Sequence, residues 1–256
     1  MKFLTFTNTG YTLPTRILAQ AKTFGVFDEI LHKTEFDIPD FIHKHDAFIK
    51  RERPGYGRFI WKPKIILDTL LDMKEGDILF YCDSGVHLNI QGLPRFHEYV
   101  RYLEKDGISM VTFNTNDRYK SYMYVKQDAI QSYYPEFNTM RDLNCAYAGI
   151  VFFKRTDASI AFLNDWLALC ETYHFLDSSR SIYYPEVNGF QGQDMDNGLF
   201  NLVKAKYKIH YDITPDEINL YHSSGAQMAH MGLNTHPNTW DWSSLKDSPF
   251  QTRRDR

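Results

Sequence analysis

The feature of this sequence that most constrains its fold is a set of short segments that are apolar along nearly their whole length. Residues 77–82, 108–113 and 146–153 are the clearest of them, and residues 3–7 form a shorter one. A strand with one face in water alternates apolar and polar residues, whereas a strand buried on both faces is a continuous apolar run. These segments therefore predict a sheet that is covered on both faces.

The segments between these strands have the apolar spacing of helices. Pro63 suits the first helical position, residues 65–73 supply a wide apolar face, and Gly76 is expected just beyond the end of that helix. Residues 157–173 and 195–206 show helical spacing as well. Strands that alternate with helices predict an α/β fold with a central, mostly parallel, Rossmann-like sheet flanked by helices.

Composition excludes several classes of protein. The 256 residues carry 29 Lys and Arg against 32 Asp and Glu, so the chain lacks the excess positive charge of a general nucleic-acid binder. No stretch approaches the run of about 20 apolar residues that spans a bilayer. Three widely spaced cysteines, at positions 82, 145 and 170, imply buried thiols rather than a disulfide framework. A cytoplasmic location is expected, either free or peripheral at a membrane.

We find no repeat or linker, and expect a single domain over residues 1–256. Three long stretches are weakly patterned, namely residues 35–59, 114–144 and 178–193. Ligands of α/β sheets bind beyond the carboxyl ends of the strands, and long irregular segments are commonly functional loops. These three stretches are therefore expected to form the walls of a site.

The sharpest candidate for chemistry is Asp83-Ser84-Gly85, which directly follows the strand predicted at residues 77–82. The position places a carboxylate in the expected crevice, and Gly85 permits close approach of the backbone to a ligand. Mg²⁺ or Mn²⁺ bound to a diphosphate needs only one or two protein carboxylates. The alternative is a simple turn, because Asp, Ser and Gly are all common turn residues.

A second candidate precedes the helix that begins near Pro63. Residues 55–63 read Gly-Tyr-Gly-Arg-Phe-Ile-Trp-Lys-Pro. Arg58 and Lys62 lie close to a helix N-terminus, where phosphate binds favourably, and Tyr56 or Trp61 could stack on a base or a sugar. The alternative is an aromatic loop that packs on the core and carries two solvated cations.

Two further candidates lie late in the chain. Asp194 and Asp196 begin the helix predicted at residues 195–206, where they either cap it or, with Gln193 beside them, bind sugar hydroxyls or act as a base. His222, in a Tyr-His-Ser-Ser-Gly segment, is either an ordinary histidine or a ligand that completes a divalent-metal site. Common zinc, P-loop and dinucleotide motifs are absent from the sequence.

The order of these pieces resembles a GT-A glycosyltransferase. More narrowly, it is similar to bacterial and giant-virus sequences that carry a GYGYWxWKP segment followed by a GDILxYxDAG strand end. Residues 55–63 and 76–85 correspond to these two motifs, which are the most specific part of the resemblance. Arg58 and Phe59 replace the second Tyr and the first Trp of the first motif, and Ser84 replaces the Ala of the second. Residues 124–128 match a Tyr-Thr-Lys-x-Asp element, and residues 148–153 match an Ala-Gly-x-x-x-Phe strand. A late His-Asp-Gln-Ser helix start is matched only partly, with Met195 in the His position.

The resemblance implies roles for these residues. Asp83 would be the first acid of a D-x-D motif that binds Mn²⁺ or Mg²⁺ with the donor diphosphate, although Gly85 replaces the second acid. His222 would complete that metal site. Residues 1–113 would form the nucleotide- and donor-binding part of the domain and residues 114–256 its acceptor-side part. Thr7 and Asn8 would lie near the nucleotide base. The remaining donor-binding residues would be Tyr56, Arg58, Trp61, Lys62, Ser84, Gly85 and Gln193.

The implied reaction moves a sugar from a UDP- or GDP-sugar donor to a hydroxyl of a glycan or lipid-linked acceptor. Charge that develops on the diphosphate leaving group would be stabilised by the metal and by Lys62 or Arg58, and Asp194 or Asp196 would serve as the base if the enzyme inverts. Gly85 and Met195 also motivate a second hypothesis, a catalytically silent sugar- or nucleotide-binding module of the same fold. A third hypothesis is a sugar nucleotidyltransferase. The Gly-rich basic loop that usually follows the first strand of such enzymes is not seen at residues 7–15 of this sequence.

Overall fold

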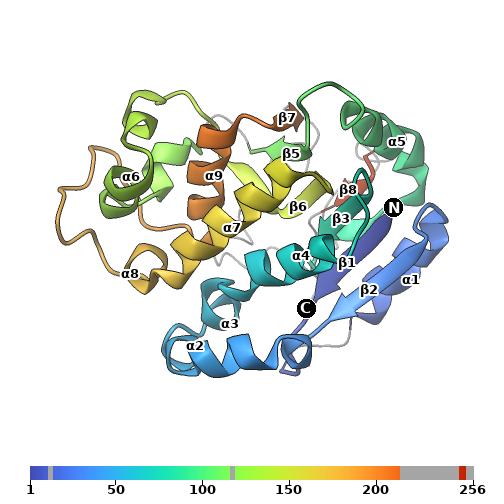
Figure 1. Cartoon of the computed structure of the whole chain (residues 1–256), viewed down its shortest axis with the longest axis horizontal. Coiled ribbons are helices and arrows are strands. Elements are labelled where there is room, and N and C mark those ends of the chain that lie inside the picture. Colours follow the sequence, from blue (N-terminus) through green and yellow to red (C-terminus); the bar gives the residue numbers. More distant parts are fainter. Residues whose placement is uncertain (11–13, 116–118, 214–247, 252–256) are drawn as a thin grey trace, which may run out of the picture.

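The computed structural model describes residues 1–10, 14–115, 119–213 and 248–251. A six-stranded sheet runs through it in the order β2-β1-β3-β6-β5-β7 (Figure 1). In chain order these strands are β1 Lys2–Phe6, β2 Glu29–Lys33, β3 Ile78–Cys82, β5 Met110–Asn114, β6 Ala146–Lys154 and β7 His210–Ile213. Strand β6 is antiparallel to both of its neighbours, and the other three pairings are parallel. The expected mostly parallel α/β sheet is confirmed.

Helices cover both faces of this sheet. On one face lie α1 (Thr15–Phe24) and α5 (Leu93–Tyr102), and on the other α4 (Trp61–Leu71), α7 (Asp157–Glu171) and α9 (Met195–Tyr207). Alternate residues of the strands enter the two cores. In β3, Leu79 and Tyr81 pack with α4, α7 and α9, whereas Phe80 and Cys82 pack with α1 and α5. The continuous apolar runs thus correspond to strands buried on both faces, as predicted.

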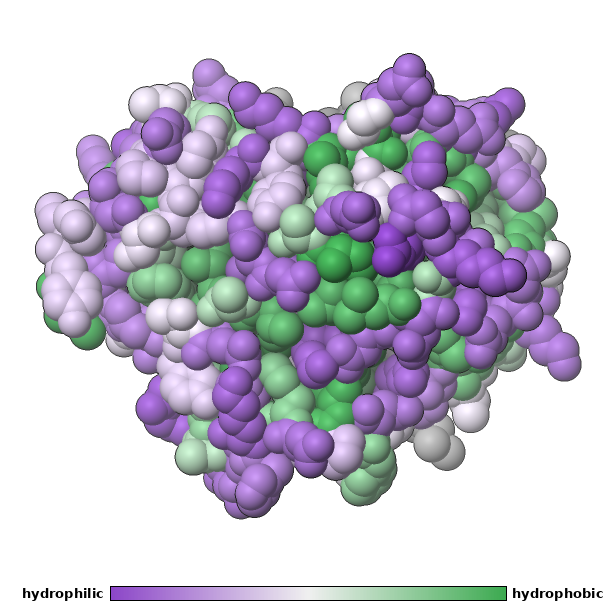
Figure 2. All heavy atoms as spheres, in the orientation of Figure 1, coloured by the Kyte–Doolittle hydropathy of each residue, from purple (hydrophilic) through white to green (hydrophobic). Residues whose placement is uncertain are grey.

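The remaining elements are short or lie at the rim of the sheet. They are α2 (Pro39–Arg51), α3 (Gly55–Arg58), α6 (Gln127–Tyr133), α8 (Tyr173–Leu176) and the pair β4 (His87–Leu88) with β8 (Phe250–Gln251). Short 3-10 turns lie between these elements, at Glu35–Asp37, Ile90–Gly92, Ser121–Tyr124 and Pro135–Thr139. The face made by α4, α7 and α9 is mostly hydrophilic, with apolar groups gathered near its middle (Figure 2).

Several predicted boundaries need correction. Helix α4 begins two residues before Pro63 and ends at Leu71, so Gly76 does not cap it; Gly76, with φ 84°, instead turns the chain toward β3. The stretch 35–59, predicted as an irregular wall, is largely helix α2. Its apolar side chains at Phe41, Phe48 and Ile49 have helical spacing and pack on the core.

The sheet order places a topological switch point between β1 and β3. The chain passes from β1 through α1 to β2 on one side, and then returns through α2–α4 to β3 on the other side of β1. Ligands of open α/β sheets bind beyond the carboxyl ends of the strands at such a point. The residues that follow Phe6 and Cys82 are therefore the first place to look for a site.

All three cysteines are buried, as expected. Among the described residues, no helix combines the length and the apolar composition that crossing a bilayer requires.

Candidate functional site

The loop after β3 is held at the switch point by main-chain and side-chain contacts. The Asp83 N–H donates to the Gly149 carbonyl on β6 at 2.8 Å. Arg16, on α1, donates to the carbonyl oxygens of Ser84 at 2.9 Å and Val86 at 2.8 Å. The first helix thus fixes the loop that carries Asp83, and Arg16 is a site residue that sequence patterning did not reveal.

The Asp83 carboxylate is the centre of a polar cluster. Its Oδ1 accepts a hydrogen bond from the Tyr81 hydroxyl at 2.7 Å and lies 3.2 Å from the Lys62 Nζ. Its Oδ2 accepts from the Tyr147 hydroxyl at 3.3 Å. The side chain of Asp83 remains 21% exposed. Asp83 is therefore oriented from three directions and still faces solvent.

Lys62 joins Asp83 to a second carboxylate, on α9. Its Nζ lies 3.5 Å from Asp196 Oδ2, and the side chains of both residues are only 3% exposed. Burial disfavours the charge on Lys62, but Asp196 and Asp83 outweigh that effect and raise the pKa of its ammonium group. Burial raises the pKa of Asp196 to about 7, against the opposing attraction of Lys62. Among the described residues, Asp196 Oδ2 has no hydrogen-bond partner.

An unusual backbone turn leads to Lys62. Five successive residues, 55–59, have positive φ angles between 53° and 81°, a conformation that non-glycine residues rarely adopt. The turn places the ring of Phe59 4.6 Å from the Lys62 Nζ, where it can stabilise the ammonium by a cation–π contact. A Cβ at Gly57 would lie 2.7 Å from Ile49, so this close packing requires glycine.

Gly149 provides the matching close approach on β6. A Cβ at this position would lie 2.5 Å from Asp83 Oδ2 and 2.4 Å from the Tyr147 ring. Glycine inside a strand often marks such a place, and this is the signal by which the sequence could have identified the Asp83–Tyr147 contact.

Other predicted donor-binding residues have partners within the protein. Arg58 is 8% exposed and donates to the carbonyl oxygens of Leu176 at 2.8 Å and Gln193 at 3.2 Å. Gln193 in turn accepts from the Lys126 N–H and donates to the Met195 carbonyl. Trp61 stacks on Phe6, with ring centroids 3.8 Å apart. These contacts tie the segment before α4 to the start of α9.

The remaining predictions lie around the same end of the sheet. The Thr7 hydroxyl is 2.7 Å from His32 Nε2 at the ends of β1 and β2, and Asn8 follows it, partly exposed. Burial, together with Glu35, raises the pKa of the Tyr56 hydroxyl. Asp194 is half-buried, and its Oδ2 accepts from the Asn197 side chain at 2.8 Å. His222 lies outside the described residues.

The chemistry of the donors tests whether a divalent metal fits. In the part of the chain that the structure describes, no group of three His, Cys, Asp or Glu side chains could hold a metal ion. Asp83 Oδ1 already contacts an ammonium group, so Oδ2 is the oxygen left for a cation. One carboxylate oxygen suffices only where a diphosphate and water supply the other ligands of Mg²⁺. The described residues around Asp83 therefore fit an ion that a bound diphosphate also ligates.

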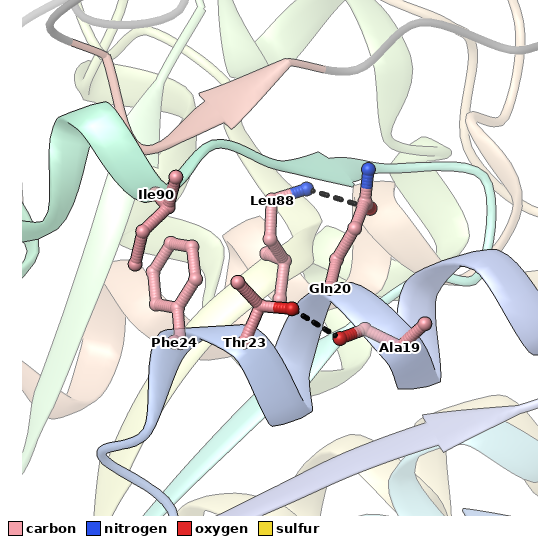
Figure 3. A pocket seen from close by; sticks show the side chains of 6 residues that line it. All are labelled: Ala19, Gln20, Thr23, Phe24, Leu88 and Ile90. Atoms are coloured by element: carbon pink, nitrogen blue, oxygen red, sulfur yellow. Dashed lines mark hydrogen bonds between the residues drawn. The ribbon is translucent and has the colours of Figure 1, made fainter.

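Two cavities lie away from this cluster. One, of about 210 Å³, lies between α1 and β4 and is lined mainly by apolar groups (Figure 3). The other, of about 240 Å³, lies at the carboxyl end of α9. Neither is lined by Lys62, Asp83 or Asp196.

The arrangement of the whole chain has counterparts among solved structures. It is similar over nearly its full length to two glycosyltransferases. One acts in glycosylation of the major capsid of the virus PBCV-1, with 10% identity and a TM-score of 0.47 over 97% of this chain and 92% of that one. The other is mouse xyloside xylosyltransferase 1, with 7% identity and a TM-score of 0.46 over 98% and 97%. No family model and no curated protein sequence matches the chain.

Proposed function

We propose that this chain is a glycosyltransferase that moves a sugar from a UDP- or GDP-sugar to a hydroxyl group of a saccharide or lipid-linked acceptor. The observation that carries the proposal is the Asp83–Lys62–Asp196 cluster at the carboxyl end of β3, beside the switch point. Such a place suits a nucleotide ligand, and a buried, pre-oriented charge cluster suits a reaction in which charge develops on a leaving group.

The three carboxylates would have different tasks because their exposure differs. Asp83 retains 21% exposure and faces the donor. Asp196 is 2% exposed, so its task is to balance the charge of Lys62 rather than to touch the acceptor. Asp194 is half-buried at the start of α9 and is the better candidate to accept a proton from the acceptor hydroxyl in an inverting reaction.

The leaving diphosphate needs compensation for its negative charge as the bond to the sugar breaks. A divalent cation held by Asp83 Oδ2 together with the diphosphate would supply that charge. Lys62 contributes by holding Asp83 in place, since its ammonium is buried against two carboxylates. Tyr81 and Tyr147 fix the orientation of the same carboxylate.

The alternative is a binding module without catalysis. It is favoured by the replacement of the second metal-binding acid by Gly85 and by the nearly complete burial of Asp196. Such a module would bind a nucleotide sugar at the same place and would not break its glycosidic bond.

A panel of UDP- and GDP-sugars distinguishes the two. Each would be added with Mn²⁺ to the wild type, to Asp83→Ala, and to Asp68→Ala as a control, because Asp68 is a surface carboxylate on α4. A ligand at 100 times its Kd stabilises the fold by about 2.7 kcal/mol, which a thermal shift detects. Binding with nucleotide release that Asp83→Ala abolishes supports the transferase. Binding without release by the wild type supports the silent module, and no binding of any donor contradicts both.

A further inference from the structure

The cavity at the carboxyl end of α9 is distinct from the Asp83 cluster. Its volume is about 240 Å³, room for a small metabolite or several water molecules. Its lining includes Met140, Leu143, Asn144, Lys204, Lys208 and His210. Asp196 lies at the opposite end of the same helix.

Positive charge exceeds negative charge at this cavity. Lys204 is only 5% exposed and donates to Asp212 Oδ1 at 2.6 Å. Burial lowers the pKa of its ammonium group, although Asp212 opposes the shift. Lys208 is one turn further on and has no acidic partner among residues 1–10, 14–115, 119–213 and 248–251. Of the two lysines that line the cavity, only Lys204 is therefore paired with a described carboxylate.

His210 adds an unsatisfied hydrogen-bond acceptor. Burial, and then the nearby Lys204, lower the pKa of His210 to about 4, so its ring is neutral near pH 7. Its Nε2 lies 3.6 Å from Asp212 Oδ2, which favours the tautomer with the proton on Nε2. Nδ1 is then an acceptor, and it is buried with no hydrogen-bond partner in the part of the chain that the structure describes. A buried acceptor left unpaired destabilises the fold, and a hydrogen bond from a ligand hydroxyl would recover that loss.

Stabilisation of the helix end explains part of this arrangement. Lysines in the last turn interact favourably with the carboxyl end of a helix, and Lys204 and Lys206 both occupy that turn of α9. That role does not account for an open cavity or for the unpaired His210 nitrogen. The apolar side chains of Met140 and Leu143 also line the cavity, and they suit the carbon skeleton of an organic ligand better than an inorganic ion.

We propose that this cavity binds a small organic anion that carries a hydroxyl group, namely a hydroxylated phosphate or carboxylate. Lys208, with Lys204 behind it, meets the anionic group. His210 Nδ1 accepts a hydrogen bond from the hydroxyl, and Met140 and Leu143 cover the carbon skeleton. The site does not depend on the proposed transferase activity.

Calorimetric titration of the full chain tests the proposal with four probes: glycerol 3-phosphate, glycerate, inorganic phosphate and glycerol. The first two combine charge with a hydroxyl and are expected to bind, and the tighter one identifies the anionic group. Inorganic phosphate lacks the carbon skeleton with its alcohol hydroxyl, and glycerol lacks the charge. Each is expected to bind at least about tenfold more weakly.

Variants separate the roles of the residues. Lys208→Met is expected to weaken the binding of glycerol 3-phosphate about tenfold, and Lys208→Arg to retain most of it. His210→Phe is expected to remove the preference for the hydroxylated probes. Lys206→Met is the matched control, because it removes the same charge from α9. The Lys206 ammonium group lies over the Tyr133 ring, and Lys206 does not line the cavity.

The proposal is overturned if neither glycerol 3-phosphate nor glycerate binds to the folded wild type. It is also overturned if Lys206→Met weakens binding as much as Lys208→Met, or if inorganic phosphate binds as tightly as glycerol 3-phosphate. Circular dichroism of each variant establishes that it is folded before titration.

Discussion

At the scale of single residues, the site depends on one buried ammonium group. Lys62 lies 3.2 Å from Asp83 and 3.5 Å from Asp196, with the ring of Phe59 beside it. Loss of one partner from a buried ion pair typically costs 3–5 kcal/mol, because the remaining charge is left uncompensated. The stability of the fold therefore depends on the charge of Asp196, which is one of the two carboxylates that compensate Lys62. Lys62 in turn holds Asp83 in its orientation.

Asp196→Asn should make that dependence measurable. The folded-state pKa of Asp196 is raised from its usual 3.8 to about 7, so the folded protein holds a proton that the unfolded chain releases. The contribution of this group to stability is therefore present below about pH 4 and is lost as the pH rises to 7. Asn does not titrate.

Urea unfolding of both proteins at pH 5, 6, 7 and 8 provides the measurement. The free energy of unfolding of Asp196→Asn should rise relative to that of the wild type between pH 5 and 7, by at most about 1.4 kcal/mol per pH unit, and then level off. Asp68→Asn, on the surface of α4, should show no such trend. A difference between wild type and Asp196→Asn that is constant with pH would contradict the assigned pKa.

At the scale of elements, the left-handed turn at residues 55–59 sets the position of Lys62. Gly57→Ala and Gly76→Ala form a matched pair, because both glycines have φ near 80°. A Cβ at Gly76 meets nothing within 4 Å, whereas one at Gly57 lies 2.7 Å from Ile49. Gly76→Ala should cost about 1 kcal/mol from its backbone alone, and Gly57→Ala about 3 kcal/mol. Equal losses in urea unfolding would show that the packing of the turn is not tight.

A second element is held by one carboxylate. Asp128, at the start of α6, accepts from the N–H groups of Ile182, Tyr183 and Tyr184 and from His174 Nε2. Burial alone would raise the pKa of Asp128, but these hydrogen bonds keep it below its usual value. The segment they hold carries Tyr183 on the surface, 78% exposed.

Asp128→Asn should release this segment, because an amide cannot accept as many hydrogen bonds and loses the charge. Limited digestion with chymotrypsin, which cleaves after aromatic residues, should cut the variant after Tyr183 several-fold faster than the wild type. Asp157→Asn, a fully exposed carboxylate at the start of α7, is the control and should be cut at the wild-type rate. Identical rates for all three proteins would show that Asp128 does not order the segment.

The elements also show what a sequence can and cannot predict. Strands β3, β5 and β6 were predictable because burial on both faces leaves a continuous apolar run. Strand β2 was missed, since its residues are only partly buried at the edge of the sheet and carry no such pattern. Helix α2 was missed although its spacing was visible, because polar residues dominate between its apolar positions.

The candidate site was likewise predictable only in part. Asp83, Lys62 and Asp196 were predicted from local motifs, and the structure brings them together. The partners of Arg58 could not be predicted, because Leu176 and Gln193 are 118 and 135 residues away along the chain. Side-chain contacts across such separations depend on tertiary packing, which local patterns do not encode.

At the scale of the whole molecule, one sheet brings together the two expected parts of the chain. Strand β6, from the second part, lies between β3 and β5 and supplies Tyr147 and Gly149 to the Asp83 cluster, while α9 supplies Asp196. The division into donor and acceptor parts remains a prediction. The site itself is assembled at the carboxyl end of β3 from segments that span residues 16–196.

The most direct test of the account is the rate of nucleotide release from UDP- and GDP-sugars by the wild type, Asp83→Asn and Asp68→Asn. These two substitutions remove the same charge, one at the switch point and one on the surface of α4. We predict that Asp83→Asn lowers the rate at least about 100-fold, in the range for loss of a pre-oriented charged group, while Asp68→Asn leaves it unchanged. Release by Asp83→Asn at the wild-type rate would contradict it.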